Sequence, residues 1–395
     1  MNIPAGFRCA AVHAGIKASP DKPDLALIVS DRPASAAGVF TQNRVCAAPV
    51  KVSRERVPAE GVRGIVVCAG NANACTGRRG LEDARRMAAV AAAEIGCRPK
   101  DILVCSTGVI GVPLPMAAVE AGIRKAAARL AGSPQNWESA ARAMMTTDTQ
   151  PKVVSHNLAL ARGSVNVLGL AKGAAMIGPH LATMLAFIVT DAGLPAHRLQ
   201  ELLRAAADVS FNCLSVEGHT STNDTVLVLA NGAAQGEQLT EQQQEQMGQV
   251  LTTVCQQLAE KIAADAEGAQ HLVHIEVQGL ASFEEARHVA RTIANSVLVK
   301  TALFGGDPNW GRIVSAVGFA GVPIQEEELA VWIDDVLVFW EGEPQPFDRV
   351  ALSRQLRDRR VVTLRVQCGR GPAACHFWTS DLTYDYVRLN AEYTT

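Results

Sequence analysis

The residue with the strongest potential for chemistry is a threonine at a joint in the sequence. Thr183 lies in the segment GPHLATMLAFIVTDA (residues 178–192), between turn-forming residues and the apolar run MLAFIV. A hydroxyl beside its own upstream carbonyl can attack that carbonyl and form an ester, if the backbone is strained and donors stabilise the tetrahedral oxyanion. Hydrolysis of this ester would separate Ala182 from Thr183 and make Thr183 a new N-terminal residue.

The amino group freed by this cleavage would supply a general base for the Thr183 hydroxyl. An α-amine has a pKa of about 7.7–8.0, so a useful fraction is unprotonated near neutral pH. This arrangement is N-terminal threonine catalysis, which needs no histidine or aspartate partner. A threonine before an apolar run is most often a helix N-cap or a strand residue, so this segment alone leaves both interpretations open.

Motifs for other kinds of catalysis are absent from the sequence. There is no nucleotide-binding P-loop, no dinucleotide-binding glycine motif, no H-E-x-x-H and no G-x-S-x-G. His271 and His274 are three residues apart next to a strand-like run, where an odd spacing places side chains on opposite faces. We therefore do not interpret them as a metal pair, and we expect neither a metal site nor a cofactor.

The composition is typical of a packed protein that acts on small molecules. The 395 residues are 48% hydrophobic and 19% charged, with a net charge of -2 and no basic block suited to nucleic acid. No secretory signal pattern begins the chain, and the most apolar region, residues 173–189, is too short to span a membrane. Cytoplasmic location is expected, and ten cysteines without a C-x-x-C motif indicate reduced, mostly buried thiols.

Strand-like and helix-like patterns alternate along the chain, which predicts mixed α/β layers. Helices are expected over residues 81–95 and 116–131, each stopped by a glycine. Residues 232–238 are the weakest point, because they are polar and rich in Gly and Gln. Two capping boxes are predicted, Thr240 with Gln243 and Ser282 with Glu285. Runs expected to form strands begin at Asp24, Gly64, Ile102, Thr225, Val273 and Val361.

Eight ordered segments, taken together, are far more specific than any single motif. They are GNANACTG from Gly70, CSTGVIG from Cys105, MTTDTQPK from Met145, KGAAMIGPHLATMLAFIVTDA from Lys172, STNDT from Ser221, AEGA from Ala266, FGGDPNWGRI from Phe304 and DLTYDYVRLNAEYTT from Asp381. The chain resembles the ornithine acetyltransferases in these segments, which span nearly its whole length. This family is also called the arginine biosynthesis bifunctional proteins or glutamate N-acetyltransferases.

The resemblance implies an α/β fold of mixed sheets in a layered αββα sandwich, of the self-processing ornithine acetyltransferase type. It implies cleavage between Ala182 and Thr183. The products would be an α chain of residues 1–182 and a β chain of residues 183–395, which together form one large α/β unit. These chains are expected to assemble as an α2β2 heterotetramer.

The implied reaction transfers an acetyl group from N-acetylornithine to glutamate by ping-pong chemistry through acetyl-Thr183, without a cofactor. The sequence leaves open whether acetyl-CoA is also a donor. In the family pattern, Thr107 and the backbone amide of Gly108 form the oxyanion hole. Lys172 suits a substrate carboxylate, and Glu267 suits the ornithine side-chain amine. The substrate contacts carried over are Thr146, Lys172, Thr183, Glu267, Asn390 and Thr395.

The chain departs from the family pattern at several positions. His180 replaces a common Asn, His219 replaces a common Asp, and Gln270 with His271 replace Thr and Lys. None of these changes alters Thr183, but they bear on substrate preference. Two alternatives stay open: a self-processed amidase or aminopeptidase that uses the same threonine, and a non-catalytic binding or scaffold protein with an intact bond before Thr183.

Overall fold

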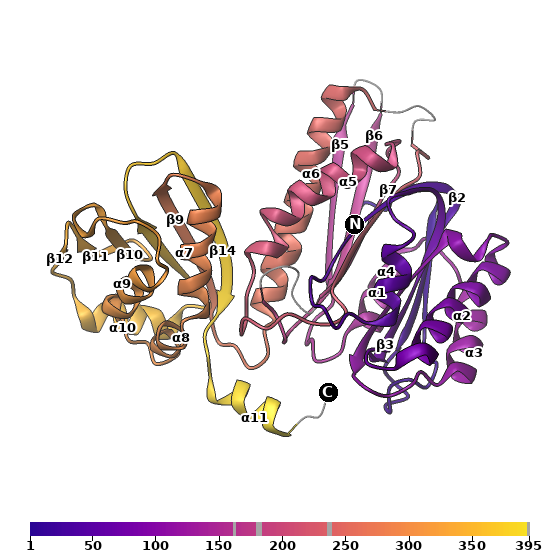
Figure 1. Ribbon diagram of the computed structural model, residues 1–395, viewed down its shortest axis with the longest axis horizontal. Coiled ribbons are helices and arrows are strands. Elements are labelled where there is room, and N and C mark those ends of the chain that lie inside the picture. The colour runs from indigo at the N-terminus through magenta and orange to yellow at the C-terminus, as the bar shows by residue number, and fades with distance from the viewer. Residues whose placement is uncertain (161–162, 179–183, 235–238, 393–395) are drawn as a thin grey trace.

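The computed structural model describes residues 1–160, 163–178, 184–234 and 239–392. It contains two mixed β-sheets, of eight and six strands, and each is covered by helices. The two sheets lie in two lobes, with the eight-stranded sheet in the larger one (Figure 1). This architecture confirms the mixed α/β class expected from the sequence.

The eight-stranded sheet has the order β4-β3-β2-β8-β7-β6-β5, and β1 pairs with β2 at its side. The β3–β4 and β7–β8 pairs are parallel, and the other pairs are antiparallel. The strands are β1 (Phe7–Val12), β2 (Leu25–Phe40), β3 (Ala59–Asn71), β4 (Ile102–Val109), β5 (Lys152–Ala159), β6 (Ser164–Lys172), β7 (Leu185–Thr190) and β8 (Thr225–Ala230).

The long strand β2 belongs to both halves of this sheet. Its first part pairs with β1 and β3, and its last part, from Ser35 to Phe40, pairs with β8. The register with β3 is irregular between Val29 and Ala36, where the strand passes from one half to the other. The first half therefore comprises β1, β3 and β4 with the start of β2, and the second comprises β5 to β8 with its end.

The two halves pack face to face and bury a common core. Ile28 of the first half and Phe187 of the second belong to one buried cluster, which also takes in Trp137. Successive strand residues point to opposite faces, so Leu27 and Val228 lie in two other clusters, on the outer faces. These outer faces are covered by helices, which confirms the layered αββα arrangement.

The helices of the larger lobe divide between these faces. Helices α2 and α3 pack together over the first half, and α5 and α6 pack together over the second. Helix α4 packs on β1 and β2. The helices are α1 (Ala48–Arg54), α2 (Gly77–Ile95), α3 (Met116–Ala127), α4 (Pro134–Met144), α5 (Ala196–Asp208) and α6 (Glu241–Ala264), with short 3-10 turns at Pro99–Asp101 and Phe211–Cys213.

The six-stranded sheet has the order β12-β11-β10-β13-β9-β14, with only the β13–β9 pair parallel. Helix α7 packs on β9 and β14, and α6 contacts β14 from the larger lobe. The elements are β9 (Leu272–Leu280), α7 (Phe283–Asn295), α8 (Val297–Phe304), α9 (Trp310–Phe319), a 3-10 turn (Glu326–Glu328), β10 (Ala330–Ile333), β11 (Val336–Trp340), β12 (Glu343–Pro344), α10 (Arg349–Asp358), β13 (Val361–Gln367), β14 (Ala373–Ser380) and α11 (Tyr384–Glu392).

The predicted strands and both capping boxes are confirmed. The predicted end of the helix over 116–131 is wrong, because α3 ends at Ala127. Ala131 and Cys9 exchange two backbone hydrogen bonds, so the chain must leave the helix before this point. The predicted weak point at 232–238 lies partly outside the described residues. Among the described helices, none combines the length and apolar character needed to cross a bilayer.

Candidate active site

Five of the predicted site residues meet at one small pocket of the larger lobe. The pocket has a volume of about 40 Å³ and is lined by Thr107, Gly108, Thr146, Lys172 and Glu267, among others. Strand β4 supplies Thr107 and Gly108, and β6 ends at Lys172. Thr146 follows α4, and Glu267 lies between α6 and β9. Both halves of the sandwich therefore contribute a strand end to the pocket.

Four predicted residues, Ala182, Thr183, His180 and Thr395, lie outside the described residues. The chain is described again from Met184, which is buried and whose amide donates to Asp224 Oδ1 at 3.2 Å. The next residue, Leu185, begins β7 and is the register partner of Lys172 in β6. The strand that starts two residues after Thr183 thus lies beside a pocket residue.

The backbone at Gly108 admits no side chain. Gly108 has φ +129°, and a Cβ there would lie 2.3 Å from the carbonyl carbon of Gly70. Asn223, another pocket residue, donates through Nδ2 to the carbonyls of Ser106 (2.8 Å) and Ala72 (2.7 Å). The Asn223 amide therefore holds the carbonyl directly before Thr107, and the close approach of the Gly70 backbone fixes the position of Gly108.

Lys172 is a buried lysine whose side chain makes one hydrogen bond among the described residues. Its side chain donates to Thr146 Oγ1 at 3.1 Å and is 2% exposed. Burial lowers the pKa of Lys172, although the nearby Asp148 carboxylate acts in the opposite direction. An ammonium group has three donors, so Lys172 can still bind an anion that enters the pocket.

Asp148 sets the electrostatics around Lys172. Its carboxylate accepts from Lys152 Nζ at 2.6 Å, from the Gly173 amide at 2.6 Å and from the Thr146 amide at 3.1 Å. Burial alone would raise the pKa of Asp148, but Lys152 and Lys172 hold it below its ordinary value. Asp148 therefore stays ionised and fixes the Thr146 backbone beside the pocket.

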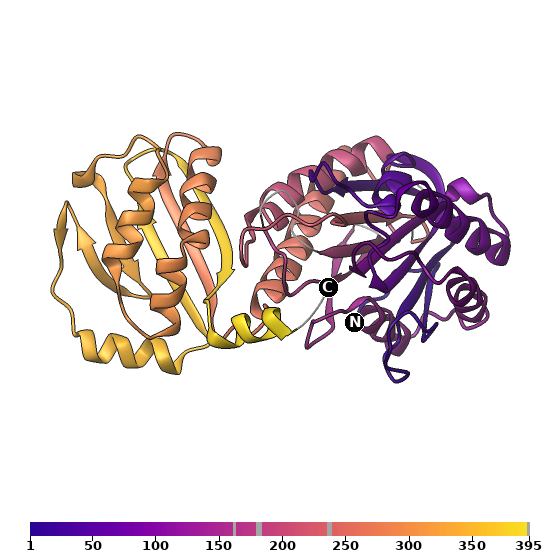
Figure 2. The same cartoon turned by 60° about the horizontal axis from the view of Figure 1, so that its bottom comes forward.

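The C-terminal helix α11 docks against the loop that carries Glu267. Asn390 Nδ2 donates to Glu267 Oε2 at 3.0 Å, and Thr383 Oγ1 donates to the Gly268 carbonyl at 2.7 Å. Gly268 has φ +65°, and a Cβ there would lie 2.5 Å from the Tyr386 amide nitrogen. Both views of the chain show α11 extending from the smaller lobe toward the larger (Figures 1 and 2). Asn390 is thus joined to the pocket through Glu267.

Two acids near this pocket were not identified from the sequence: Asp224, which is fully buried, and Glu217, which is half-buried. Asp224 follows Asn223 in the quoted STNDT segment, and burial raises its pKa well above the ordinary value. Its Oδ2 atom has no hydrogen-bond partner among the described residues, and neither has Oε2 of Glu217. The segment itself was a signal for Asp224, but burial of an acid is not visible in a sequence.

His219 and His271, the departing histidines within the described residues, do not line the pocket. His219 is exposed. His271 is buried beside β9, with Nδ1 2.7 Å from Asp381 Oδ2 and Nε2 2.8 Å from the Leu356 carbonyl. The Asp381 hydrogen bond raises the pKa of His271, which suits an imidazolium that donates from both nitrogens. Among the described residues, no group of three His, Cys, Asp or Glu could hold a metal ion.

Glu217 gives a pH-dependent test of this structure. Burial raises its pKa to about 8, so the folded chain binds this proton more tightly than the unfolded chain, with a pKa of about 4.3. The contribution of Glu217 to the free energy of unfolding is therefore greatest below pH ~4.3, and it is lost as the pH rises toward 8. We expect Glu217→Gln to raise the unfolding temperature by several degrees at pH 9 and little at pH 4.5.

Thermal unfolding of both proteins across this pH range measures the effect. Oε1 of Glu217 accepts from the Ile177 amide at 2.6 Å, a bond that the glutamine amide oxygen can keep. Glu55→Gln, at an exposed position, is the matched control and should give no pH-dependent difference. An equal change at pH 4.5 and pH 9 for Glu217→Gln would contradict the assignment.

Fold and site together define a layered α/β protein with a polar pocket at its strand ends. The chain belongs to the ArgJ family, whose sequence profile matches residues 8–395. It is 46% identical to the arginine biosynthesis bifunctional protein ArgJ of Symbiobacterium thermophilum, over 100% of this chain and 98% of that protein. It is 44% identical to the protein of the same name from Geobacter sulfurreducens, over the full length of both.

A solved structure agrees with this assignment. The crystal structure of the arginine biosynthesis bifunctional protein argJ from Bacillus halodurans is similar to this chain, with 39% sequence identity and a TM-score of 0.50. The match covers 51% of this chain and 96% of the crystallised chain. By their names, these relatives are proteins of arginine biosynthesis.

Proposed function

We propose that the chain is a self-processing glutamate N-acetyltransferase, which moves an acetyl group from N-acetylornithine to glutamate. The observation that carries this proposal is the convergence of Thr107, Gly108, Thr146, Lys172 and Glu267 on one pocket. The strand that begins two residues after Thr183 lies beside Lys172. Membership of the ArgJ family supports the reaction class.

The first step is cleavage of the Ala182–Thr183 bond. The Thr183 hydroxyl attacks the Ala182 carbonyl, and the C–N bond breaks to give an ester and a free Thr183 amine, which takes up the hydroxyl proton. Water then hydrolyses the ester, which releases the Ala182 carboxylate and restores the Thr183 hydroxyl. The lengths of the matched chains support this step. One crystallised chain of the Bacillus halodurans relative corresponds to 51% of this chain, and residues 183–395 are a little over half of it.

Acetyl transfer then follows in two halves. The Thr183 amine accepts the hydroxyl proton, and the oxygen attacks the acetyl carbonyl of N-acetylornithine. The amide C–N bond breaks, and the proton passes to the departing amine. Ornithine is released, and the acetyl group stays on Thr183 as an ester. The α-amine of glutamate then attacks this ester and regenerates the hydroxyl. Thr107 and the Gly108 amide stabilise both oxyanions, each by about 3–4 kcal/mol in a site without bulk water.

The charges of the pocket match the two substrates. Lys172 binds the carboxylate that both amino acids carry, and Glu267 binds the side-chain ammonium of ornithine. Thr146, Asn390 and Thr395 complete the contacts with the substrates. We further propose that the two chains assemble as an α2β2 heterotetramer.

The function is tested by incubating the purified protein with N-acetylornithine and glutamate. The expected products are N-acetylglutamate and ornithine, and intact-mass measurement should give two chains, one beginning with Thr183. Release of free acetate instead would indicate an amidase, and a single intact chain without activity would indicate a scaffold protein. The same assay with acetyl-CoA in place of N-acetylornithine tests the second donor.

Glu267→Gln is expected to separate the two substrates. It removes the charge that pairs with the ornithine ammonium, and a hydrogen bond to a charged group is worth about 1.5–3 kcal/mol. The KM for N-acetylornithine should rise about tenfold or more, while the KM for glutamate changes little. Glu55→Gln, the same change at an exposed position that does not line the pocket, is the matched control and should alter neither KM. Equal changes in both KM values would contradict the assignment of Glu267.

A further inference from the structure

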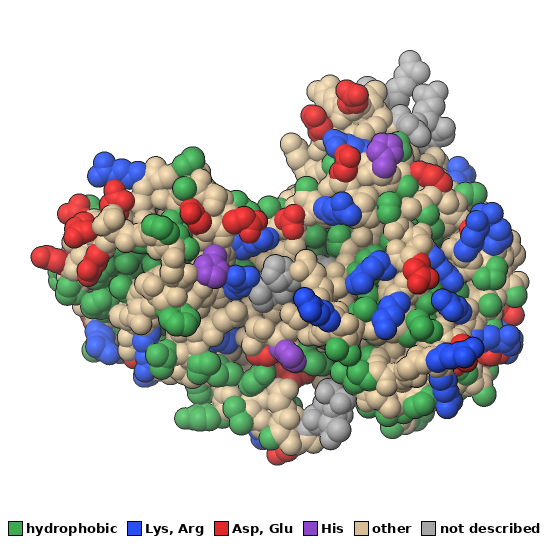
Figure 3. All heavy atoms as spheres, viewed as in Figure 1, with side chains coloured by type: hydrophobic (Ala, Val, Ile, Leu, Met, Phe, Trp, Pro, Cys, Tyr) green, Lys and Arg blue, Asp and Glu red, His purple; other side chains and the backbone are tan. Residues whose placement is uncertain are grey.

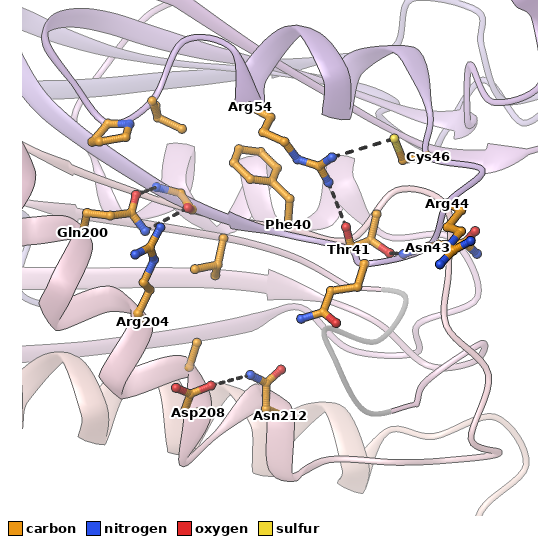
Figure 4. Close-up of a pocket in the computed structure, with 16 residues that line it drawn as sticks. Phe40, Thr41, Asn43, Arg44, Cys46, Arg54, Gln200, Arg204, Asp208 and Asn212 are labelled. Atoms are coloured by element: carbon orange, nitrogen blue, oxygen red, sulfur yellow. Dashed lines mark hydrogen bonds between the residues drawn. The ribbon is translucent and has the colours of Figure 1, made fainter.

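A second and larger pocket lies on the larger lobe, apart from the active-site pocket. It has a volume of about 710 Å³, and none of its lining residues belongs to the pocket described above. Phe40 ends β2 and Thr41 follows it, α1 supplies Arg54, and α5 supplies Gln200 and Arg204 (Figure 4). Lys and Arg side chains also gather on the face of this lobe seen in Figure 3.

The lining of this pocket carries more positive than negative charge. It includes the guanidinium groups of Arg44, Arg54 and Arg204, against the single carboxylate of Asp208. Among the described residues, none of the three arginines forms an ion pair with a carboxylate, and Asp208 Oδ1 already accepts from Asn212 Nδ2 at 2.8 Å. The charge of the three guanidinium groups therefore remains uncompensated in the pocket.

The pocket is also built of fixed groups. Arg54 lies over the Phe40 ring, 5.5 Å from its centroid, and donates to the Thr41 carbonyl at 2.8 Å. The Gln200 side chain exchanges two hydrogen bonds of 3.0 Å with the Gly38 backbone, which fixes α5 to β2. Arg54 and Gln200 are thus held in place by hydrogen bonds before any ligand enters.

We propose that this pocket, hereafter the arginine pocket, binds a small polyanion with two or more anionic groups. A guanidinium fork matches phosphate and carboxylate oxygens in the same bidentate geometry. Three such groups around a volume of this size suit a ligand whose anionic groups are separated. Phosphate and carboxylate ligands of this kind share multiple negative charges, and experiment distinguishes between them.

The arginine pocket is connected to the active site through one loop. Thr41 Oγ1 donates to the Ser221 carbonyl at 2.6 Å, and the Ala47 amide donates to the Thr222 carbonyl at 2.9 Å. Ser221 and Thr222 themselves line the active-site pocket. A polyanion that fixes residues 41–47 therefore acts on the loop that borders the catalytic residues, so its binding changes the rate of acetyl transfer.

Calorimetric titration of the purified full chain with pyrophosphate and, separately, with citrate tests the proposal. At least one probe should bind saturably at constant ionic strength, and the stronger one identifies phosphate or carboxylate as the preferred group. The double variant Arg44→Gln/Arg204→Gln should weaken binding at least tenfold. Arg198→Gln is the control on the same helix, because Arg198 pairs with Glu201 and does not line the pocket.

Two outcomes would overturn the proposal. One is that the double variant binds like the unmodified protein. The other is that neither probe binds; if the double variant then also changes the oligomeric state in light scattering, the arginines belong to a subunit contact. A measurement of the acetyl-transfer rate with bound probe rests on the proposed function, but the binding titration does not. Failure of the arginine pocket to bind a polyanion can therefore be distinguished from failure of the proposed function.

Discussion

Thr183→Ala is expected to leave the 395-residue chain in one piece and to abolish acetyl transfer. The alanine has no hydroxyl to attack the Ala182 carbonyl, so neither the ester nor the free amine can form. Loss of a covalent nucleophile lowers kcat by a factor on the order of 10⁴ or more. Intact-mass measurement and an assay of N-acetylglutamate formation check the two effects separately.

Thr183→Ser is the matched control for this experiment. Serine keeps a hydroxyl at the same position, so partial cleavage and measurable transfer are expected. An uncleaved Thr183→Ala chain with full activity would refute the proposed mechanism. A cleaved Thr183→Ala chain would show that another group breaks the bond.

Gly108→Ala is expected to lower kcat by about 10²- to 10³-fold, which is the usual effect of losing one oxyanion-hole donor. The added Cβ would lie 2.3 Å from the Gly70 carbonyl carbon and 2.5 Å from the Asn71 amide nitrogen. These backbone atoms cannot move away without shifting the end of β3. The amide of residue 108 would then no longer point at the developing oxyanion. Steady-state kinetics with N-acetylornithine and glutamate measure the effect.

Gly111→Ala separates this clash from the strain of a positive φ. Gly111 has φ +82°, but a Cβ there would meet no atom within 4 Å. Its alanine variant should lose some stability, of the order of 1–2 kcal/mol, and keep kcat. If both variants lose kcat equally, the position of the Gly108 amide is not the cause.

Much of the fold could be predicted from local patterns, because β-strands and helix caps depend on neighbouring residues. The strand from Thr225 to Ala230 begins where the sequence predicted it, and the capping box at Ser282 forms as predicted. The division of β2 between two half-sheets could not be predicted, since it depends on pairing with β3 and with β8. The end of α3 was missed for the same reason: a distant partner, Cys9, pairs with Ala131.

The candidate site shows the same limit. Thr107, Thr146, Lys172 and Glu267 were named through a family resemblance, because no local pattern joins residues so far apart in the chain. The structure brings them to one pocket. Asp224 was missed because nothing in its sequence neighbourhood indicates complete burial, which depends on the packing of whole layers.

The order of strands in the eight-stranded sheet has a consequence for the two chains expected after cleavage. Strands β7 and β8 would belong to the C-terminal fragment, yet they lie between β2 and β6 of the N-terminal fragment. Two ladders of backbone hydrogen bonds, β2–β8 and β6–β7, would thus run along the seams between the fragments. Pulling the fragments apart would bare four strand edges at once. Neither piece should refold by itself, and the cut protein should melt in one cooperative transition.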